Sequence, residues 1–402
     1  MAEHVSAEEH SDVAFVGAPD SLEARLAAEA GIDFIPVKAK GWDRARPLTL
    51  VTASLRAATS FFRCLRILRT WRADVVVGFG GYVSVPLGLA ASFAGVPLVL
   101  HEQNSVPGLA NRVLSRWAAC VCVTYPESIS RLAHTDRALV TGDPVRPTVL
   151  QADAARGRAA LGLDGDGPVL LAFGGSRGAR HINEALVGLY GRLSAIEGLR
   201  VVHVAGRTEK ASVQGILAKA AGGGATPWWQ VLEYVDAMGD ALAAADLVVC
   251  RAGATSIAEL TVLGKPSVLV PYPFATDDHQ SQNALPLLAA KAAVLVSDSG
   301  LDSPAFGDEI VSLLTDGERR RAMATAASLL GRPLAAHAVA EAALEAGAAG
   351  SPWRFRVKRE KPAPDPAPAP VPGVEPVSAP AQSTQSGAAP APDDTAKAEV
   401  RP

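Results

Sequence analysis

The chain has 402 residues, 49% apolar and 20% charged, a balance typical of a globular protein with room for two domains. Its formal net charge of −3 argues against a dedicated nucleic-acid binder, which normally carries a strong basic excess. Four scattered cysteines are too few for a disulfide framework, so we expect buried thiols in a reducing compartment.

The N-terminal residues 1–11 are polar and acidic, without the basic and apolar segments of a signal peptide. The apolar stretch around residues 86–100 is interrupted by Gly95 and Pro97 and is too short to span a bilayer. These features predict a cytoplasmic protein, unless it binds a membrane surface.

Short β-branched runs alternate with longer segments rich in Ala and Leu, which indicates a doubly wound α/β fold. Several of the runs are almost continuously apolar, as parallel strands are when helices cover both faces. Helices are expected between them, including 182–193 and 255–263. Strands are expected at 13–16, 75–77, 98–100, 118–123, 139–141, 169–173, 201–204, 247–250 and 267–270.

Prolines and glycines between residues 144 and 168 indicate a domain boundary. We predict an N-terminal domain at 1–147 and a C-terminal domain at 148–350 that ends in a closing helix. Two such Rossmann-like halves would face a cleft, where ligands usually bind. The tail, 351–402, is rich in Pro, Ala, Ser and acidic residues and is expected to be disordered.

Two small-residue turns follow strands in the C-terminal half, at 174–180 and 251–254. Glycines allow a phosphate to approach the backbone, and the free N–H groups of the next helix favour an anion. After the second turn, Thr255 and Ser256 supply hydroxyls and Glu259 could accept both hydroxyls of a ribose. Tight packing and a favourable acid near a helix start are the alternatives, but two such turns favour a nucleotide-sugar donor.

A polar loop at 271–284 is dense in amides, which suit hydroxyl-rich ligands. Asp277, Asp278 and His279 raise the alternative of a metal site, although three adjacent residues rarely converge on one ion.

Two further loops follow strands in the N-terminal half. The glycine-rich segment 78–84 would form a lip able to hold an anionic acceptor. In the segment 101–104, His101 and Glu102 are candidates for acid–base catalysis, with orienting roles as the alternative.

Four motifs in this order, Gly80-Gly81-Tyr82-Val83-Ser84, His101-Glu102-Gln103-Asn104, Gly174-Gly175-Ser176-Arg177-Gly178-Ala179 and Arg251-Ala252-Gly253-Ala254, resemble the MurG family within glycosyltransferase family 28. The resemblance implies a GT-B fold of two Rossmann-like domains and an inverting transfer from UDP-N-acetylglucosamine. The implied acceptor is lipid I, undecaprenyl-pyrophosphoryl-N-acetylmuramyl pentapeptide, glycosylated at the muramyl C4 hydroxyl to give lipid II. The implied place is the cytoplasmic face of the membrane, in peptidoglycan synthesis, with no cofactor and no metal.

The resemblance also implies site residues. Glu259 would hold the ribose, Val235 would lie beside the uracil, and Gln280 would hold sugar hydroxyls, while Thr255 and Ser256 would face the diphosphate. Gly80, Gly81 and Tyr82 would contact the acceptor. At position 143 this chain has Asp143 where the family usually has Asn. The implied donor contacts are Asn104, Arg146, Ser176, Val235, Ala254, Thr255, Ser256, Ile257, Ala258, Glu259 and Gln280.

The family also has a first strand and a loop of the form Gly-Gly-Thr-x-Gly-His, which this sequence does not contain. The histidine of that loop is the implied catalytic base. We expect it to lie upstream of Met1, so that the given chain would be N-terminally truncated. Two alternatives stay open: a catalytically impaired UDP-sugar-binding remnant, and another enzyme of this architecture, a glycolipid synthase or a UDP-sugar epimerase.

Residues 48–72 form a basic amphipathic pattern. The apolar side would pack on the sheet in an ordinary surface helix, or partly enter an anionic membrane surface in an interfacial one. The lipid acceptor implied above favours the interfacial helix. The basic residues are Arg56, Arg63, Arg66, Arg69 and Arg72, among Leu50, Leu55, Phe61, Phe62, Leu65 and Leu68.

Overall fold

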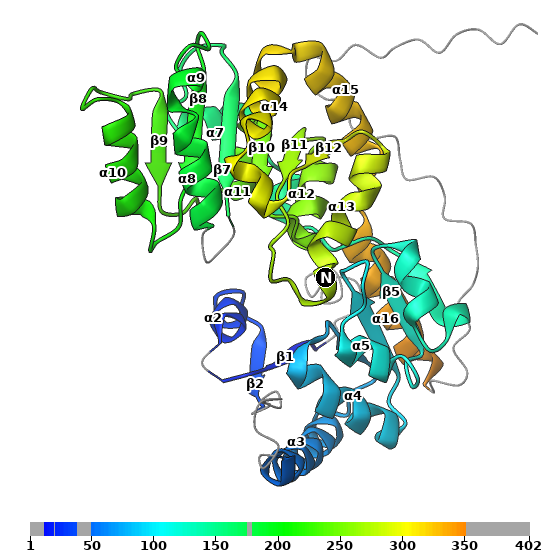
Figure 1. The fold of residues 1–402 in the computed structure, drawn as a ribbon. Coiled ribbons are helices and arrows are strands. Elements are labelled where there is room, and N and C mark those ends of the chain that lie inside the picture. Colours follow the sequence, from blue (N-terminus) through cyan, green and yellow to red (C-terminus); the bar gives the residue numbers. More distant parts are fainter. Residues whose placement is uncertain (1–11, 20, 38–49, 175–178, 351–402) are drawn as a thin grey trace, which may run out of the picture. The chain divides into compact units, whose positions relative to one another are not determined.

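The computed structural model describes residues 12–19, 21–37, 50–174 and 179–350, without the side chains of 50–57 and 276. Parallel strands and covering helices make up this part of the chain (Figure 1). The predicted α/β class with two parallel-sheet regions is confirmed.

Three of the sequence predictions fall outside the described residues. These are the tail at 351–402, the donor contact Ser176, and the segment at Met1 before which the loop histidine is expected. The place of the catalytic base upstream of Met1 therefore stays a prediction.

The C-terminal half contains a six-stranded parallel sheet of order β12-β11-β10-β7-β8-β9. The chain runs outward from β7 through β8 to β9, then returns to pair β10 with β7 and runs outward again. This reversal opens a crevice at the carboxyl ends of β7 and β10, where open α/β sheets bind their ligands. The strands are β7 (Val169–Phe173), β8 (Arg200–Val204), β9 (Trp229–Leu232), β10 (Leu247–Cys250), β11 (Ser267–Leu269) and β12 (Ala293–Leu295).

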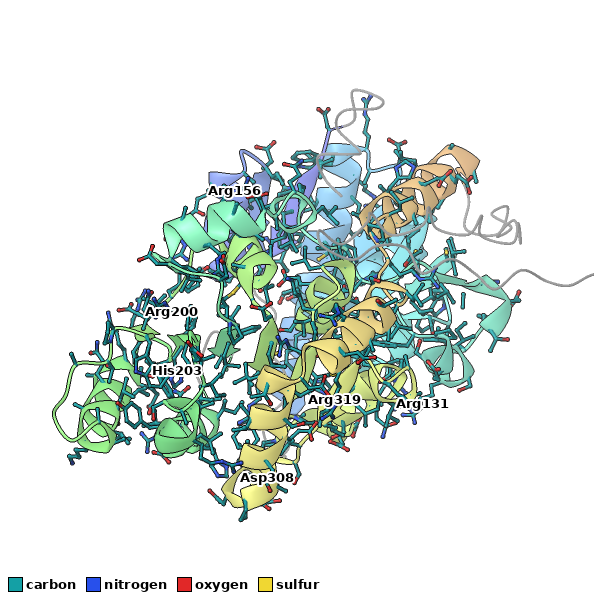
Figure 2. The ribbon with its side chains drawn as sticks, turned by 90° about the horizontal axis from the view of Figure 1, so that it is seen from above. Arg131, Arg156, Arg200, His203, Asp308 and Arg319 are labelled. Atoms are coloured by element: carbon teal, nitrogen blue, oxygen red, sulfur yellow. The ribbon has the colours of Figure 1, made fainter. Side chains whose placement is uncertain are left out.

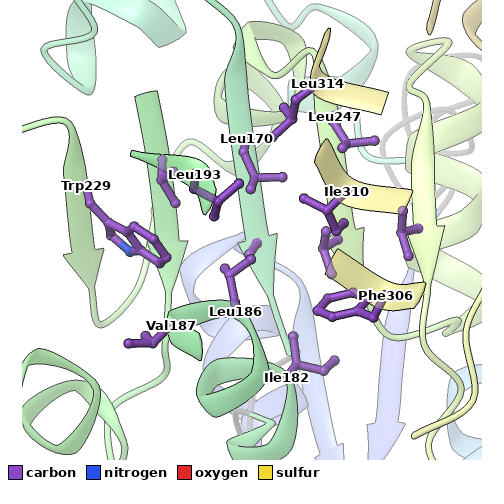
Figure 3. Close-up of a cluster of buried hydrophobic side chains, with 14 of the residues drawn as sticks. Leu170, Ile182, Leu186, Val187, Leu193, Trp229, Leu247, Phe306, Ile310 and Leu314 are labelled. Atoms are coloured by element: carbon purple, nitrogen blue, oxygen red, sulfur yellow. The ribbon is translucent and has the colours of Figure 1, made fainter. Parts of the chain in front are cut away.

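Alternation along the central strands gives this sheet two apolar faces. Leu170 and Leu247 belong to one core cluster, with helices α8 and α14 (Figure 3), while Leu171 and Val248 belong to the other. Successive strand residues point to opposite faces, so a continuous apolar run is required when both are covered. The helices of this half are α8 (Arg180–Gly188), α9 (Tyr190–Leu193), α10 (Lys210–Ala220), α11 (Met238–Ala244), α12 (Ala254–Val262), α13 (His279–Ala289), α14 (Pro304–Thr315) and α15 (Gly317–Ser328), with 3-10 turns η4 (Thr276–Asp278) and η5 (Asp298–Asp302).

The N-terminal half contains a four-stranded parallel sheet of order β3-β4-β5-β6 and a separate parallel pair, β1-β2. One core cluster joins α3, α4 and α5 to one face of the larger sheet. Within the described residues, β1 pairs only with β2, and β3 only with β4. The elements are β1 (Ala14–Gly17), α2 (Leu22–Glu29), β2 (Asp33–Pro36), α3 (Leu50–Trp71), β3 (Val76–Gly78), α4 (Gly81–Ala94), β4 (Leu98–Glu102), α5 (Leu109–Leu114), β5 (Cys120–Val123), η2 (Pro126–Arg131), η3 (Thr135–Arg137) and β6 (Ala138–Val140).

The opposite face of the β3–β6 sheet is covered by the last described helix, α16 (Ala335–Ala349). Its Val339 and Ala342 share a core cluster with Cys120 and Cys122 of β5. Both thiols are buried and unpaired, as are Cys64 and Cys250. The chain therefore returns from the second sheet to close the core of the first.

The named strands fall within about two residues of their predicted positions, a usual margin for element boundaries. The predicted helix 182–193 is interrupted, because α8 ends at Gly188 and a new turn starts at Tyr190. Three strands were not predicted, namely β2, β9 and β12.

Two short helices link the sheets, α6 (Pro147–Leu150) and α7 (Ala154–Ala160), and α7 lies directly on α11. Arg156, labelled in Figure 2, donates to both carboxylate oxygens of Asp240, with its Nε 2.5 Å from Oδ2. A Cβ on Gly157 would lie 2.1 Å from the carbonyl oxygen of Asp240. Only glycine therefore allows the two helices to approach this closely.

Gly157→Ala is expected to lower the free energy of unfolding by about 1–3 kcal/mol, because the clash is with backbone that cannot move aside. Gly215→Ala is the matched control, since Gly215 is also helical but has open space around its Cβ position. It is expected to raise stability by roughly 0.4–1 kcal/mol. Denaturant unfolding of both variants measures the difference, and equal effects would contradict the close approach.

Candidate functional site

Of the two turns predicted to hold phosphate, the one after β10 lies among the described residues, whereas residues 175–178 of the one after β7 do not. Hydrogen bonding pairs Cys250 with Phe173, so β7 and β10 end at the same level of the sheet. Gly253 lies at the N-cap of α12 without a side-chain cap, and Thr255 is exposed in the first turn. The first N–H groups of a helix have no intrahelical acceptors and carry partial positive charge, which suits a diphosphate.

Arg146 and Glu259, both predicted donor contacts, meet in an ion pair. Arg146 Nη2 lies 2.8 Å from Glu259 Oε1. Glu259 is buried on α12, whereas the Arg146 side chain is 57% exposed. The acid is therefore held in place with one oxygen bonded, at the turn of α12 after the exposed Thr255.

Two open pockets lie by the segment that follows β9. Arg146 lines the larger, of about 560 Å³, together with Met238, and Val235 lines the smaller, of about 330 Å³. The pockets share Asp236 and Ala237, so they form one depression after β9. Val235 lines this depression, and its place beside the uracil stays a prediction.

The loop before Gln280, which lies in the first turn of α13, is fixed by internal bonds. The backbone N–H of Tyr272 donates to Gln280 Oε1 over 2.8 Å. Arg251 donates to the carbonyl oxygens of Val270 and Pro271, and its guanidinium lies 5.6 Å from the centre of the Tyr272 ring. Arg251 therefore holds the loop and does not point its charge at the crevice.

Asn104 is positioned from both halves of the chain. Its backbone N–H donates to Glu102 Oε1 over 3.0 Å, and its Oδ1 accepts from Asn283 Nδ2 over 3.1 Å. Asn283 is fully buried on α13 and accepts from both the backbone N–H and the hydroxyl of Ser105. This amide bridge couples the loop after β4 to the helix that carries Gln280.

The geometry gives Glu102 and His101 orienting roles. Glu102 is buried, and its carboxylate accepts from Asn104, from the backbone of Gly108 and from Asn111. His101 Nε2 lies 3.0 Å from the carbonyl oxygen of Gly142, so that nitrogen carries the proton. Burial lowers the pKa of His101, which keeps the ring neutral. The acid–base alternative for these two residues stays a prediction.

The three predicted acceptor residues lie at the start of α4. Gly80 and Gly81 have φ angles of 82° and 78°, a left-handed backbone that glycine adopts without strain. They turn the chain sharply after β3 and leave Tyr82 70% exposed. The acceptor contact of these three residues stays a prediction.

The remaining predicted donor residues lie on α12. Ala254 and Ile257 are buried, and Ser256 and Ala258 are partly exposed, so the run can contribute backbone and hydroxyl groups. A cluster that the sequence did not reveal lies nearby: His181 Nδ1 is 2.8 Å from Asp298 Oδ2, and Arg251 pairs with the same carboxylate. Within the described residues, no three His, Cys, Asp or Glu side chains converge as a metal site.

The parallel α/β sheets and the strand-order reversal between β7 and β10 define a class, the enzymes of GT-B fold. The pattern of the glycosyltransferase family 28 N-terminal domain matches residues 1–123, and that of the family 28 C-terminal domain matches residues 169–341. The chain belongs to glycosyltransferase family 28.

Its relatives include the UDP-N-acetylglucosamine--N-acetylmuramyl-(pentapeptide) pyrophosphoryl-undecaprenol N-acetylglucosamine transferase of Desulfitobacterium hafniense. The two are 38% identical over 83% of this chain and 91% of the relative. The crystal structure of Acinetobacter baumannii MurG covers 85% of this chain and 93% of its own, with 29% identity and a TM-score of 0.68. A UDP-N-acetylglucosamine 2-epimerase, 14% identical with a TM-score of 0.62, covers 85% of this chain and 89% of its own and shows a shared fold alone.

Glu259→Ala is expected to weaken UDP binding by about 1–3 kcal/mol, the usual effect of leaving the partners of a charged hydrogen bond unpaired. The exposed Glu197→Ala serves as the matched control and should bind UDP like the parent. Titration calorimetry with UDP measures both, and unchanged affinity in a folded Glu259 variant would remove that residue from the donor site.

Proposed function

We propose that this chain transfers N-acetylglucosamine from UDP-N-acetylglucosamine to lipid I, giving lipid II with inversion at the sugar. The observation that carries the proposal is the α12 start, where free N–H groups and Thr255 adjoin the Arg146–Glu259 pair. The relative in Desulfitobacterium hafniense, named for this reaction, supports the choice of donor and acceptor.

Charge stabilisation of the leaving group follows from this arrangement. When the glycosidic bond breaks, negative charge develops on the diphosphate of the leaving UDP. The partial positive charge at the α12 start and the guanidinium of Arg146 lie where that charge would be stabilised. Glu259 would hold the ribose and so fix the position of the diphosphate against the helix.

We further propose that α3 and α4 meet an anionic membrane surface, where a polyprenyl-linked acceptor would be presented. Cys64, Leu65 and Leu68 of α3 are buried in the core. Phe62 and Phe93 are 66% and 73% exposed, and both rings pack against Phe61. Exposed aromatic rings beside basic residues are typical of interfacial helices. Among the described helices, none combines the length and apolar sequence needed to cross a bilayer.

Replacing Arg63, Arg66 and Arg69 with Glu is expected to reduce binding to anionic vesicles, since each basic residue near such a surface contributes about 1 kcal/mol. All three are exposed on α3, so the fold should persist. The charge-preserving Lys variant is the control and should still sediment with vesicles. Equal sedimentation of the Glu variant and the parent would contradict the interfacial helix. The predicted face also includes Arg56, Leu50 and Leu55, whose side chains lie outside the described ones.

We propose that a further parallel strand, followed by a Gly-Gly-Thr-x-Gly-His loop, belongs between β1 and β3. The support is that each of these strands has one edge unpaired among the described residues. Such edges destabilise a parallel sheet and invite another strand. The loop histidine would supply the catalytic base.

Transfer of radiolabelled N-acetylglucosamine to a lipid I analogue tests this, with the chain as given compared with a form extended upstream of Met1 by that strand and loop. The given chain is expected to bind UDP weakly, to show little transfer and to be protease-sensitive in its N-terminal half. The extended form should transfer, and its loop His→Ala variant should not. Robust turnover by the unextended chain would show that the catalytic base lies elsewhere.

A further inference from the structure

Asp143 is a buried carboxyl to which the proposed function gives no role. It follows β6 and is 8% exposed. Its Oδ1 lies 4.0 Å from His101 Nε2, and its side chain faces that of Thr255. Its Oδ2 is buried without a hydrogen-bond partner among the described residues. Burying a carboxylate oxygen without a hydrogen bond costs much free energy, whereas burying a protonated carboxyl group costs much less.

The groups that face Asp143 do not favour its ionised form. On β4, His101 is neutral and its Nε2 proton is directed to Gly142, and Glu102 is a second acid. On α12, Glu259 adds a third acid, although it is paired with Arg146. Tyr125, after β5, is close enough that the charge of Asp143 raises the pKa of Tyr125. Arg332 faces Gly142 with its aliphatic carbons.

The pKa of Asp143 reflects these surroundings. Burial raises it to about 7, the negative charges of Glu259 and Glu102 add to the rise, and the hydrogen bond from Thr255 opposes it. Near neutral pH the protonated and the ionised forms of Asp143 are therefore both populated.

We propose that Asp143 is a positioning residue of the donor site, whose neutral form lets Thr255 direct its hydroxyl proton at the donor's diphosphate. The inference rests on the donor placement proposed above. An ionised carboxylate accepts only, so it would take the Thr255 proton and turn the hydroxyl lone pairs towards the diphosphate. A neutral carboxyl can donate to Thr255 and leave the hydroxyl proton for a phosphate oxygen. Ionisation would also add a negative charge beside an anionic ligand.

The sign of the pH dependence follows from the raised pKa. Donor binding requires the proton, so affinity is full below the pKa of Asp143 and is lost as pH rises through about 7. For one such group, the dissociation constant increases about tenfold between pH 6 and pH 8.

Titration calorimetry with UDP-N-acetylglucosamine at pH 6 and pH 8 tests the proposal. This probe is preferable to UDP because its diphosphate is esterified at both ends and does not titrate in this window. The parent should weaken about tenfold between the two pH values, and Asp143→Asn, whose amide always donates, should change by less than about twofold. Asp164→Asn, the same change at an exposed position, should show the same change of dissociation constant between pH 6 and pH 8 as the parent.

Equal slopes in the parent and in Asp143→Asn would overturn the inference. Thr255→Val gives a second test that does not depend on the folding of the Asp143 variant. It should lose more affinity at pH 6 than at pH 8, because Thr255 donates to the ligand only at the lower pH. A change of affinity between the two pH values equal to that of the parent would also overturn the inference. Unchanged UDP affinity in Glu259→Ala would instead mean that the donor placement itself is wrong.

Discussion

The pairing of β7 with β10 is the constraint on which the donor site depends. These strands are distant in sequence, yet their register places Phe173 beside Cys250 at the edge where both chains leave the sheet. Parallel strands covered on both faces must be apolar throughout, so their interior offers no polar group to a ligand. We therefore expect recognition in the segments that follow the strands, and the strand-order reversal brings the ends of β7 and β10 together.

Buried amide and carboxylate groups then couple this site to the N-terminal sheet. Glu102 uses both oxygens on backbone and side-chain donors of its own loop, and Asn283 continues the network from α13. Buried polar groups are tolerated only when they are hydrogen-bonded, so removing one member leaves several partners unpaired. The same bonds that stabilise the loop tie Asn104 to α13, the helix on which Gln280 lies.

Much of the fold was predictable because its strongest signals are local. Apolar runs such as 169–173 and 247–250 marked central strands, and the small-residue turns after them marked the α12 start. The strands that were missed, β2, β9 and β12, each have a single neighbour and residues that are only partly buried, so no continuously buried apolar run marks them. The Arg146–Glu259 pair and the His181–Asp298 pair join distant segments, and no spacing rule reveals which cation will meet which acid.

The acids near the start of α12 show how partners, and not residue type, set the charge of a site. Glu259 and Asp143 are both buried, but Arg146 bonds only to the first. Glu102 accepts from N–H donors on both of its oxygens, while Asp143 has an oxygen without any partner among the described residues. Three carboxyl groups so close together are compatible with an anionic ligand only if they do not all carry charge. We assign the proton to Asp143, because its buried Oδ2 has no hydrogen-bond donor among the described residues.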